Sequence, residues 1–187
     1  MTYPEYALIG GKRYRINTDF KVALRCFSVV NDPSICDEER TLAVVYLLFG
    51  FVPDYEEIAA FLDKATLFLQ RGKKEVKESS RPDMDFEYDQ PYIAASFMSD
   101  YRIDLSRANM HFWQFCDLLQ GLTDQCALSR VRELRNYSLS DVRDAKTRTK
   151  IAQAQAAVAL PAKHSREEIE ALDEFEKLFD AHGEEGV

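Results

Sequence analysis

Apolar residues recur at helical spacing between Ile16 and Gly50, and this stretch predicts two helices. Thr18 is a suitable N-cap for the first helix. The apolar face of that helix comprises Phe20, Ala23, Leu24, Phe27 and Val30. The turn Asn31-Asp32-Pro33 is expected to end the helix, because proline disfavours helical backbone at the residue before it.

The second helix is predicted to begin at the acidic run Asp37-Glu38-Glu39, which suits the positive end of a helix dipole. The run from Leu42 to Phe49 is apolar throughout, which predicts a helix buried on all sides at the centre of the fold. We therefore expect Leu47 and Phe49 in the central core. Gly50 is placed to end this helix, and the apolar run is too short for a membrane span.

The segments Tyr6 to Ile9 and Lys12 to Ile16 flank the pair Gly10-Gly11. Glycine pairs supply the positive φ angles of two-residue turns, so these segments predict a β-hairpin. A lone hairpin is only marginally stable. It must therefore lie on the helices, which is the favoured alternative, or pair its edge with another chain.

A third helix is predicted from Tyr55 to Arg71, with Asp54 as its N-cap and Gly72 at its end. Its apolar stripe comprises Ile58, Leu62, Ala65 and Leu69. The polar segment 73–83 follows and is expected to be a flexible connection to a second helical layer.

The second layer is predicted to begin near Asp85. Asp89 can cap a helix that carries Pro91 in its first turn and continues to Tyr101. The next helix is predicted from Ser106 to Gln120. Its apolar face comprises Phe112, Phe115, Cys116 and Leu119.

Trp113 and His111 lie beside that apolar face. Trp113 is a candidate anchor for a protein partner, although a tryptophan at the margin of the core is the commoner case. A lone histidine in this position favours a structural role, because no carboxylate or nucleophile stands at a helical spacing from it.

Between residues 130 and 150, seven basic residues accompany three acidic ones. The basic residues are Arg130, Arg132, Arg135, Arg143, Lys146, Arg148 and Lys150. Aromatic residues are nearly absent among them, so nucleic-acid bases would find little to stack on. A solvated or acid-paired helix face is therefore favoured. The alanine-rich stretch from Asp141 to Leu160 predicts a helical arm with little packing.

A last helix is predicted beyond Pro161, over residues 165–181. Its apolar stripe comprises Ile169, Leu172, Phe175 and Phe179, on a strongly acidic body. We expect this helix to dock onto the basic arm, either in the same chain or in a neighbouring copy. A frayed tail is the alternative.

The chain has 187 residues, 46% of them apolar, and a formal net charge of −8. That charge argues against a general binder of nucleic acid or of anionic membranes. The first residues lack the basic and then apolar run of a signal peptide, so we expect a cytoplasmic protein with reduced thiols. The cysteines Cys26, Cys36, Cys116 and Cys126 have no C-x-x-C spacing and are expected to be free.

Motifs for catalysis are not found in the sequence, which has no phosphate-binding loop, dinucleotide-binding turn, nucleophile elbow or H-E-x-x-H helix. We therefore expect no enzyme activity, no cofactor and no metal site. An alternating acidic run comprises Asp83, Asp85, Glu87 and Asp89. It lacks the glycine and the terminal glutamate of a calcium loop, so metal binding is disfavoured there.

These patterns predict a mainly α fold, namely a helical bundle in two layers with a small N-terminal β-hairpin and an extended C-terminal helical arm. The expected units are residues 1–72, the hairpin with three helices, residues 85–137, the second layer, and residues 138–187, the arm with the acidic helix. Partner binding or self-association is assigned to Arg130, Arg132, Arg135, Arg143, Ile169, Leu172, Phe175, Phe179 and Trp113.

Several strings resemble the bacteriophage "gene product fifteen" family over about residues 6–150. In the first half these are Ile16-Asn17-Thr18-Asp19-Phe20, Ala23-Leu24, Asp32-Pro33-Ser34-Ile35, Glu39-Arg40 and Leu47-Leu48-Phe49-Gly50. In the second half they are Asp85-Phe86-Glu87, Ala95-Ser96-Phe97, Tyr101, Ile103-Asp104-Leu105, His111-Phe112-Trp113 and Phe115. Cys36 and Phe112 depart from the family's pattern, where a serine and a tryptophan are expected.

The resemblance implies a tail assembly chaperone of long-tailed phages, encoded just before the tape-measure protein, and it supplies no catalytic or ligand residues. It implies the tape-measure protein as a partner, together with a tail tube protein or a second tail assembly chaperone. We further expect a homo-oligomer in the cytoplasm of the bacterial host, absent from the mature virion. The alternative is a regulatory or nucleic-acid-binding helical module that uses the basic patch at residues 130–150.

Overall fold

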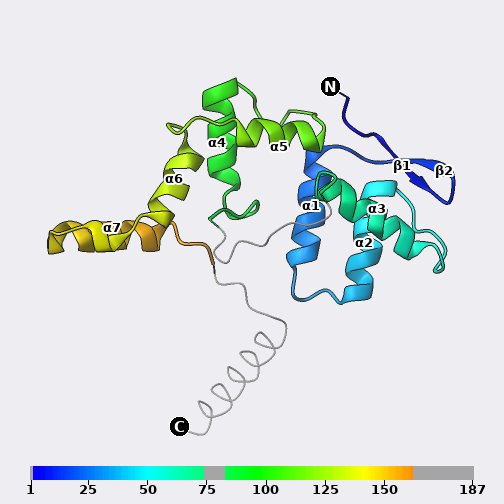
Figure 1. The fold of residues 1–187 in the computed structure, drawn as a ribbon, viewed down its shortest axis with the longest axis horizontal. Coiled ribbons are helices and arrows are strands. Elements are labelled where there is room, and N and C mark those ends of the chain that lie inside the picture. Colours follow the sequence, from blue (N-terminus) through cyan, green and yellow to red (C-terminus); the bar gives the residue numbers. More distant parts are fainter. Residues whose placement is uncertain (1, 74–82, 162–187) are drawn as a thin grey trace, which may run out of the picture.

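A computed structural model describes residues 2–73 and 83–161 of the chain. Within these ranges the fold is mainly α-helical with one N-terminal hairpin, which confirms the predicted fold class. The strands are β1 (Tyr6–Ile9) and β2 (Lys12–Arg15). The helices are α1 (Phe20–Asn31), α2 (Asp37–Phe49), α3 (Ile58–Leu69), α4 (Gln90–Tyr101), α5 (Phe112–Gln120), α6 (Ala127–Asn136), the 3-10 helix η1 (Leu139–Asp141) and α7 (Ala145–Ala157). Figure 1 shows an elongated arrangement, with the hairpin and α7 at opposite ends.

The predicted hairpin is confirmed, and it lies on the helices. Gly10 and Gly11 have φ angles of 54° and 79°, as a two-residue turn between twisted strands requires. The side chains of Ala7 and Ile9 are buried in the core. The Tyr14 ring meets the Phe61 ring of α3 edge to face, with centroids 4.8 Å apart. The favoured alternative of a hairpin packed on helices is therefore the one observed.

Helix α1 occupies the predicted position, but the predicted cap was wrong by one residue. Asp19 is the N-cap, and its carboxylate accepts a hydrogen bond of 2.8 Å from the Lys21 amide. The Thr18 carbonyl instead accepts a hydrogen bond of 2.7 Å from the Phe112 amide of α5. A long-range contact thus decides which residue is available to begin the helix.

Helix α2 begins at Asp37 and ends at Gly50, as predicted, with a φ angle of 80° at the glycine. The expectation that α2 is buried on all sides was wrong. Only one face, which carries Val44, Val45 and Leu48, is buried against its neighbours. On the other face the side chains are exposed, Leu42 to 39% and Tyr46 to 57%.

Within α2, the residues expected at the core centre are shifted by one position. Leu48 is fully buried, whereas Leu47 and Phe49 are partly buried and pack against the rim of the core. The run from Leu42 to Phe49 is uniformly apolar, so it carries no periodic signal from which the buried face could be chosen.

Helix α3 begins at Ile58, three residues later than predicted, because residues 55–57 form a turn. In that turn the Glu57 amide donates to the Asp54 carbonyl. The buried side chains of α3 are Phe61, Ala65 and Phe68, so the predicted apolar stripe omitted both phenylalanines. The predicted flexible connection at 73–83 lies mostly outside the described residues.

Helix α4 confirms the prediction, but α5 begins at Phe112 and not at Ser106. The segment before α5 pairs with the segment before α1. The Phe20 amide donates to the Met110 carbonyl at 3.1 Å, next to the bond from Phe112 to Thr18. This bridge uses extended backbone, which excludes helix from the preceding residues.

The core is continuous across the two predicted layers. The Phe115 ring of α5 stacks on Phe20 of α1 at 4.9 Å and on Phe97 of α4 at 5.2 Å, measured between ring centroids. Helix α7 has no buried residue, in keeping with the predicted sparse packing of the arm, defined from here on as residues 138–161. Within residues 2–73 and 83–161, no helix combines the length and apolar content needed to span a membrane.

Candidate partner-binding site

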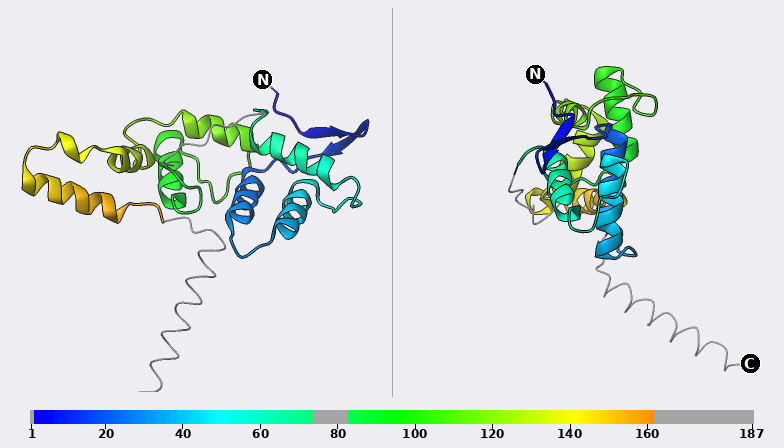
Figure 2. Two further views of the ribbon diagram at one scale, coloured as in Figure 1. Left: turned by 60° about the horizontal axis from the view of Figure 1, so that its bottom comes forward. Right: turned by 90° about the vertical axis from the view of Figure 1, so that its right-hand side faces the viewer.

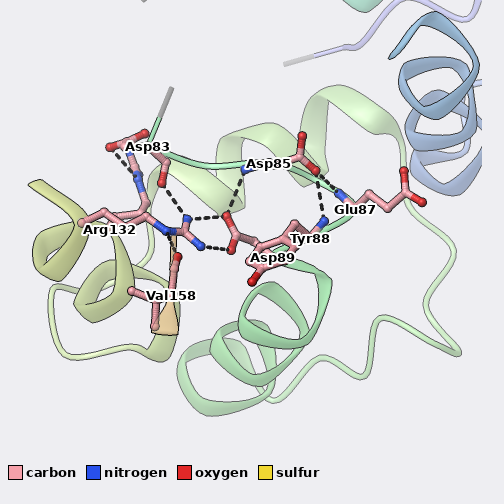
Figure 3. Close-up of polar contacts among 8 residues, drawn as sticks. Asp83, Asp85, Glu87, Tyr88, Asp89, Arg132 and Val158 are labelled. Atoms are coloured by element: carbon pink, nitrogen blue, oxygen red, sulfur yellow. Dashed lines mark hydrogen bonds and ion pairs between the residues drawn. The ribbon is translucent and has the colours of Figure 1, made fainter. Parts of the chain in front are cut away.

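Two arginines of the predicted binding patch, Arg132 and Arg135, form ion pairs with acidic residues of the same chain near the start of α4. Figure 3 shows this cluster of polar contacts. Arg135 of α6 donates to both carboxylate oxygens of Asp89, at 2.7 and 2.6 Å. Their side chains are only 8% and 0% exposed. The hydrogen bond to Asp89 raises the pKa of the Arg135 guanidinium further, so the group stays charged. Arg135 is therefore not available to a partner.

The same guanidinium joins three separate segments of the chain. Besides Asp89, it donates to the Asp83 carbonyl at 2.8 Å and to the Val158 carbonyl, after α7, at 2.6 Å. All of its nitrogens therefore have partners, which is what a buried charge requires. Arg135 fixes the arm against the start of α4.

The alternating acidic run serves as a set of caps and ion pairs. Asp83 pairs with Arg132 at 2.9 Å, and the Asp85 carboxylate accepts from the amides of Glu87 and Tyr88 (Figure 3). Asp89 stands at the predicted N-cap of α4, but its side chain makes no capping hydrogen bond to that helix. Among the described residues, no group of three His, Cys, Asp or Glu side chains is arranged to hold a metal ion.

The remaining basic side chains lie mainly on the arm. Arg130 is exposed on α6, and Arg143 is exposed just before α7. Lys146 and Lys150 are exposed on α7 itself. The prediction of an acid-paired face thus holds for Arg132 and Arg135. Because Arg135 is buried, the nucleic-acid alternative loses that residue.

Trp113 belongs to the margin of the core. Its indole nitrogen donates to the Phe68 carbonyl at 2.9 Å, and its ring stacks on the Phe68 ring. His111 is the N-cap of α5, where its Nδ1 accepts from the Trp113 amide at 3.0 Å. Both residues hold α5 in place, as the commoner alternatives predicted. The other predicted contacts, Ile169, Leu172, Phe175 and Phe179, lie outside the described residues.

The cysteines are free, as predicted, and three of the four are buried. Burial raises the pKa of Cys26 to about 12 and that of Cys116 to about 11. Thiols with such values are almost wholly protonated at neutral pH and are poor nucleophiles. These two cysteines are therefore packing residues.

An apolar groove between α1 and α4 is the surface that the sequence patterns did not reveal. Its volume is about 610 Å³. Its apolar lining comprises Phe20, Leu24, Phe86, Pro91, Ile93, Ala94, Leu105 and Phe115. Its polar lining residues are Lys21, Arg25, Ser28, Glu87, Gln90 and Ser106. The one available signal was Phe86, an apolar residue within an acidic run.

Ring contacts and a hydrogen bond hold the lining residues of the groove in place. Phe115, stacked between Phe20 and Phe97, contributes to it together with residues of both helices. Phe86 stacks on Phe27 of α1 at 5.4 Å between ring centroids. Lys21 donates to the Ser106 carbonyl at 3.0 Å and so ties α1 to the segment that follows α4. Such an apolar groove between helices can accept side chains from the apolar face of a third helix.

The family model described as bacteriophage Gp15 protein matches residues 5–160. The matched range takes in both strands, every described helix and the groove, and it ends one residue before the end of the arm. No curated protein and no solved structure matches the chain.

Proposed function

We propose that this chain, which belongs to the bacteriophage Gp15 family, is a tail assembly chaperone. Its partner in this proposal is the tape-measure protein of a long-tailed phage. In this proposal the protein catalyses no reaction, works in the cytoplasm of the bacterial host and is left out of the finished virion. A tail tube protein or a second tail assembly chaperone is a further partner. The observation that supports tape-measure binding best is the apolar groove between α1 and α4.

The groove suits the chemistry of that partner. A tape-measure protein is a long helical chain whose apolar stripes would aggregate if they stayed exposed. A groove of about 610 Å³ is as large as a pocket for a small molecule, for which about 300 to 1,000 Å³ is usual. It can therefore shield a few apolar side chains of such a stripe, and shielding a long stripe requires many copies.

The test adds a carboxylate to the apolar part of the groove lining. Ala94 is half-buried on α4 and lines the groove, whereas Ala95 is exposed and does not line it. Ala94→Glu should reduce the amount of soluble tape-measure protein on co-expression, because a carboxylate in the groove opposes apolar burial. Ala95→Glu, the same change one position along the same helix, should leave the soluble amount unchanged.

Thermal melts of both variants control for folding. Equal soluble amounts of tape-measure protein with both variants would remove the groove from the proposal. A tape-measure protein that is soluble without this chain, or insoluble beside an excess of it, would contradict the chaperone function itself.

A further inference from the structure

Two exposed surfaces of opposite charge lie at opposite ends of the molecule. The first is the loop of residues 50–57 between α2 and α3, and the second is the arm. In both Figure 1 and the left view of Figure 2, the loop lies near the hairpin end and α7 forms the other end. We propose that copies of this chain associate head to tail, with the loop of one copy bound to the arm of the next.

The loop has the composition of an interface centre. Phe51, Val52 and Tyr55 are exposed to 40%, 51% and 91%. Large apolar side chains exposed together in one short loop are typical of interaction sites, and tyrosine is enriched among the residues that dominate binding. The acids of the loop are Asp54, Glu56 and Glu57, all exposed, and the loop contains no basic residue.

The arm is complementary to the loop both in charge and in its apolar surface. Helix α7 contains three basic residues and no acidic one, and Lys146 and Lys150 are exposed on it. Arg143 is exposed just before the helix. The second half of α7 is rich in alanine, so a tyrosine from the loop can approach its backbone closely. Opposite charges on the two surfaces steer them together and fix their orientation.

The geometry requires two copies. The loop and the arm of one chain lie at opposite ends, so neither surface can cover the other within the same molecule (Figures 1 and 2). Because the two surfaces differ, the contact is heterologous, and a row of copies leaves one loop unpaired at one end and one arm unpaired at the other. Such a contact builds a ring or a filament. The inference does not depend on tape-measure binding, although an array would set many grooves along one partner.

The test uses two variants of the full chain, each with one surface removed. The loop variant is Val52→Ser with Tyr55→Ser, and the arm variant is Lys146→Glu with Lys150→Glu. The wild-type mass measured by light scattering should rise above the 21.5 kDa of one copy as concentration rises. Each variant should weaken the association by about tenfold or more, as expected when central interface residues are lost.

Mixing the two variants tests the polarity of the contact. The intact arm of the loop variant can bind the intact loop of the arm variant, and the remaining surfaces are both removed. The mixture should therefore form a species of two copies and nothing larger. Long assemblies in the mixture, or two variants that stay as single copies when mixed, would overturn the proposal.

Matched controls separate the two surfaces from general effects of charge and hydrophobicity. Arg102→Glu with Arg107→Glu changes the net charge as the arm variant does, at exposed sites elsewhere. Tyr88→Ser with Met98→Ser removes exposed apolar side chains elsewhere. Both controls should assemble like the wild type.

A wild-type chain that has the mass of one copy at all concentrations would overturn the proposal. A mass that falls in the arm variant but not in the loop variant would also overturn the proposal. It would mean that the arm binds the acidic residues 162–187 and not the loop.

Discussion

Arg135 illustrates how a single side chain can look like a binding residue in the sequence and be a structural one in the fold. Its neighbours Arg130 and Arg132 are exposed, so local composition suggests one basic surface. The partner of Arg135, Asp89, is 46 residues away along the chain. No local pattern marks that pairing, which depends on how α4 and α6 pack together.

The first prediction concerns this ion pair. Arg135→Ala leaves the Asp89 carboxylate buried without its partner, and a loss of this kind costs about 3 to 5 kcal/mol in free energy of unfolding. Arg132→Ala is the matched control, because its pair with Asp83 is partly exposed and worth at most about 1 kcal/mol. Urea unfolding of both variants measures the difference.

A second variant separates a lost charge partner from lost packing. Replacing both members with apolar residues, Arg135→Met with Asp89→Leu, removes the uncompensated charge and should recover a large part of the lost stability. Equal free energies of unfolding for Arg135→Ala and Arg132→Ala would show that the buried ion pair contributes no more to stability than the exposed one.

At the level of elements, the Gly10-Gly11 pair located the hairpin, apolar spacing located α1, α3 and α5, and local signals located several ends. Gly10-Gly11, Gly50 and the acids at Asp37 act through backbone geometry and the helix dipole, which are local properties. The starts of α3 and α5 were wrong, by three and six residues. For α5 the cause is the pairing of its preceding segment with the segment before α1, which is a tertiary contact.

The groove was beyond prediction for a related reason. Leu24 was recognised as part of an apolar face, whereas Phe86 was assigned to no apolar face and was named only within a string that resembles the family. Whether such residues fill the core or line a groove depends on the distance between α1 and α4. In this fold Phe115 stacks between Phe20 and Phe97, so that distance depends on a residue of a third helix.

The second prediction concerns which face of α2 is buried. Leu48→Ala removes a fully buried side chain and should lower the free energy of unfolding by about 2 to 5 kcal/mol. Leu42→Ala, the same change on the exposed face of the same helix, should change it by no more than about 0.5 kcal/mol. Similar melting temperatures for the two variants would mean that α2 is rotated relative to this description.

For the whole molecule, the important question is whether the two predicted layers are separate units. The division into residues 1–72 and 85–137 followed from the polar connection between them. The buried cluster, however, includes side chains from both ranges, with Phe115 packed on Phe20 and Phe97. A shared core couples the stability of its parts, so the layers are expected to lose their structure together.

The last prediction is that this core unfolds in one cooperative transition. Trp113 is the only tryptophan and packs on Phe68 of α3, so its fluorescence reports the junction between the layers. Far-UV circular dichroism reports the helices of both layers. The two urea curves should have the same midpoint, since separation of the layers would expose Phe20 and Phe115 at a large cost in apolar burial. Phe20→Leu should shift both midpoints to lower urea by the same amount. A fluorescence midpoint well below the dichroism midpoint would instead mean that the layers separate first and then unfold independently, as two domains.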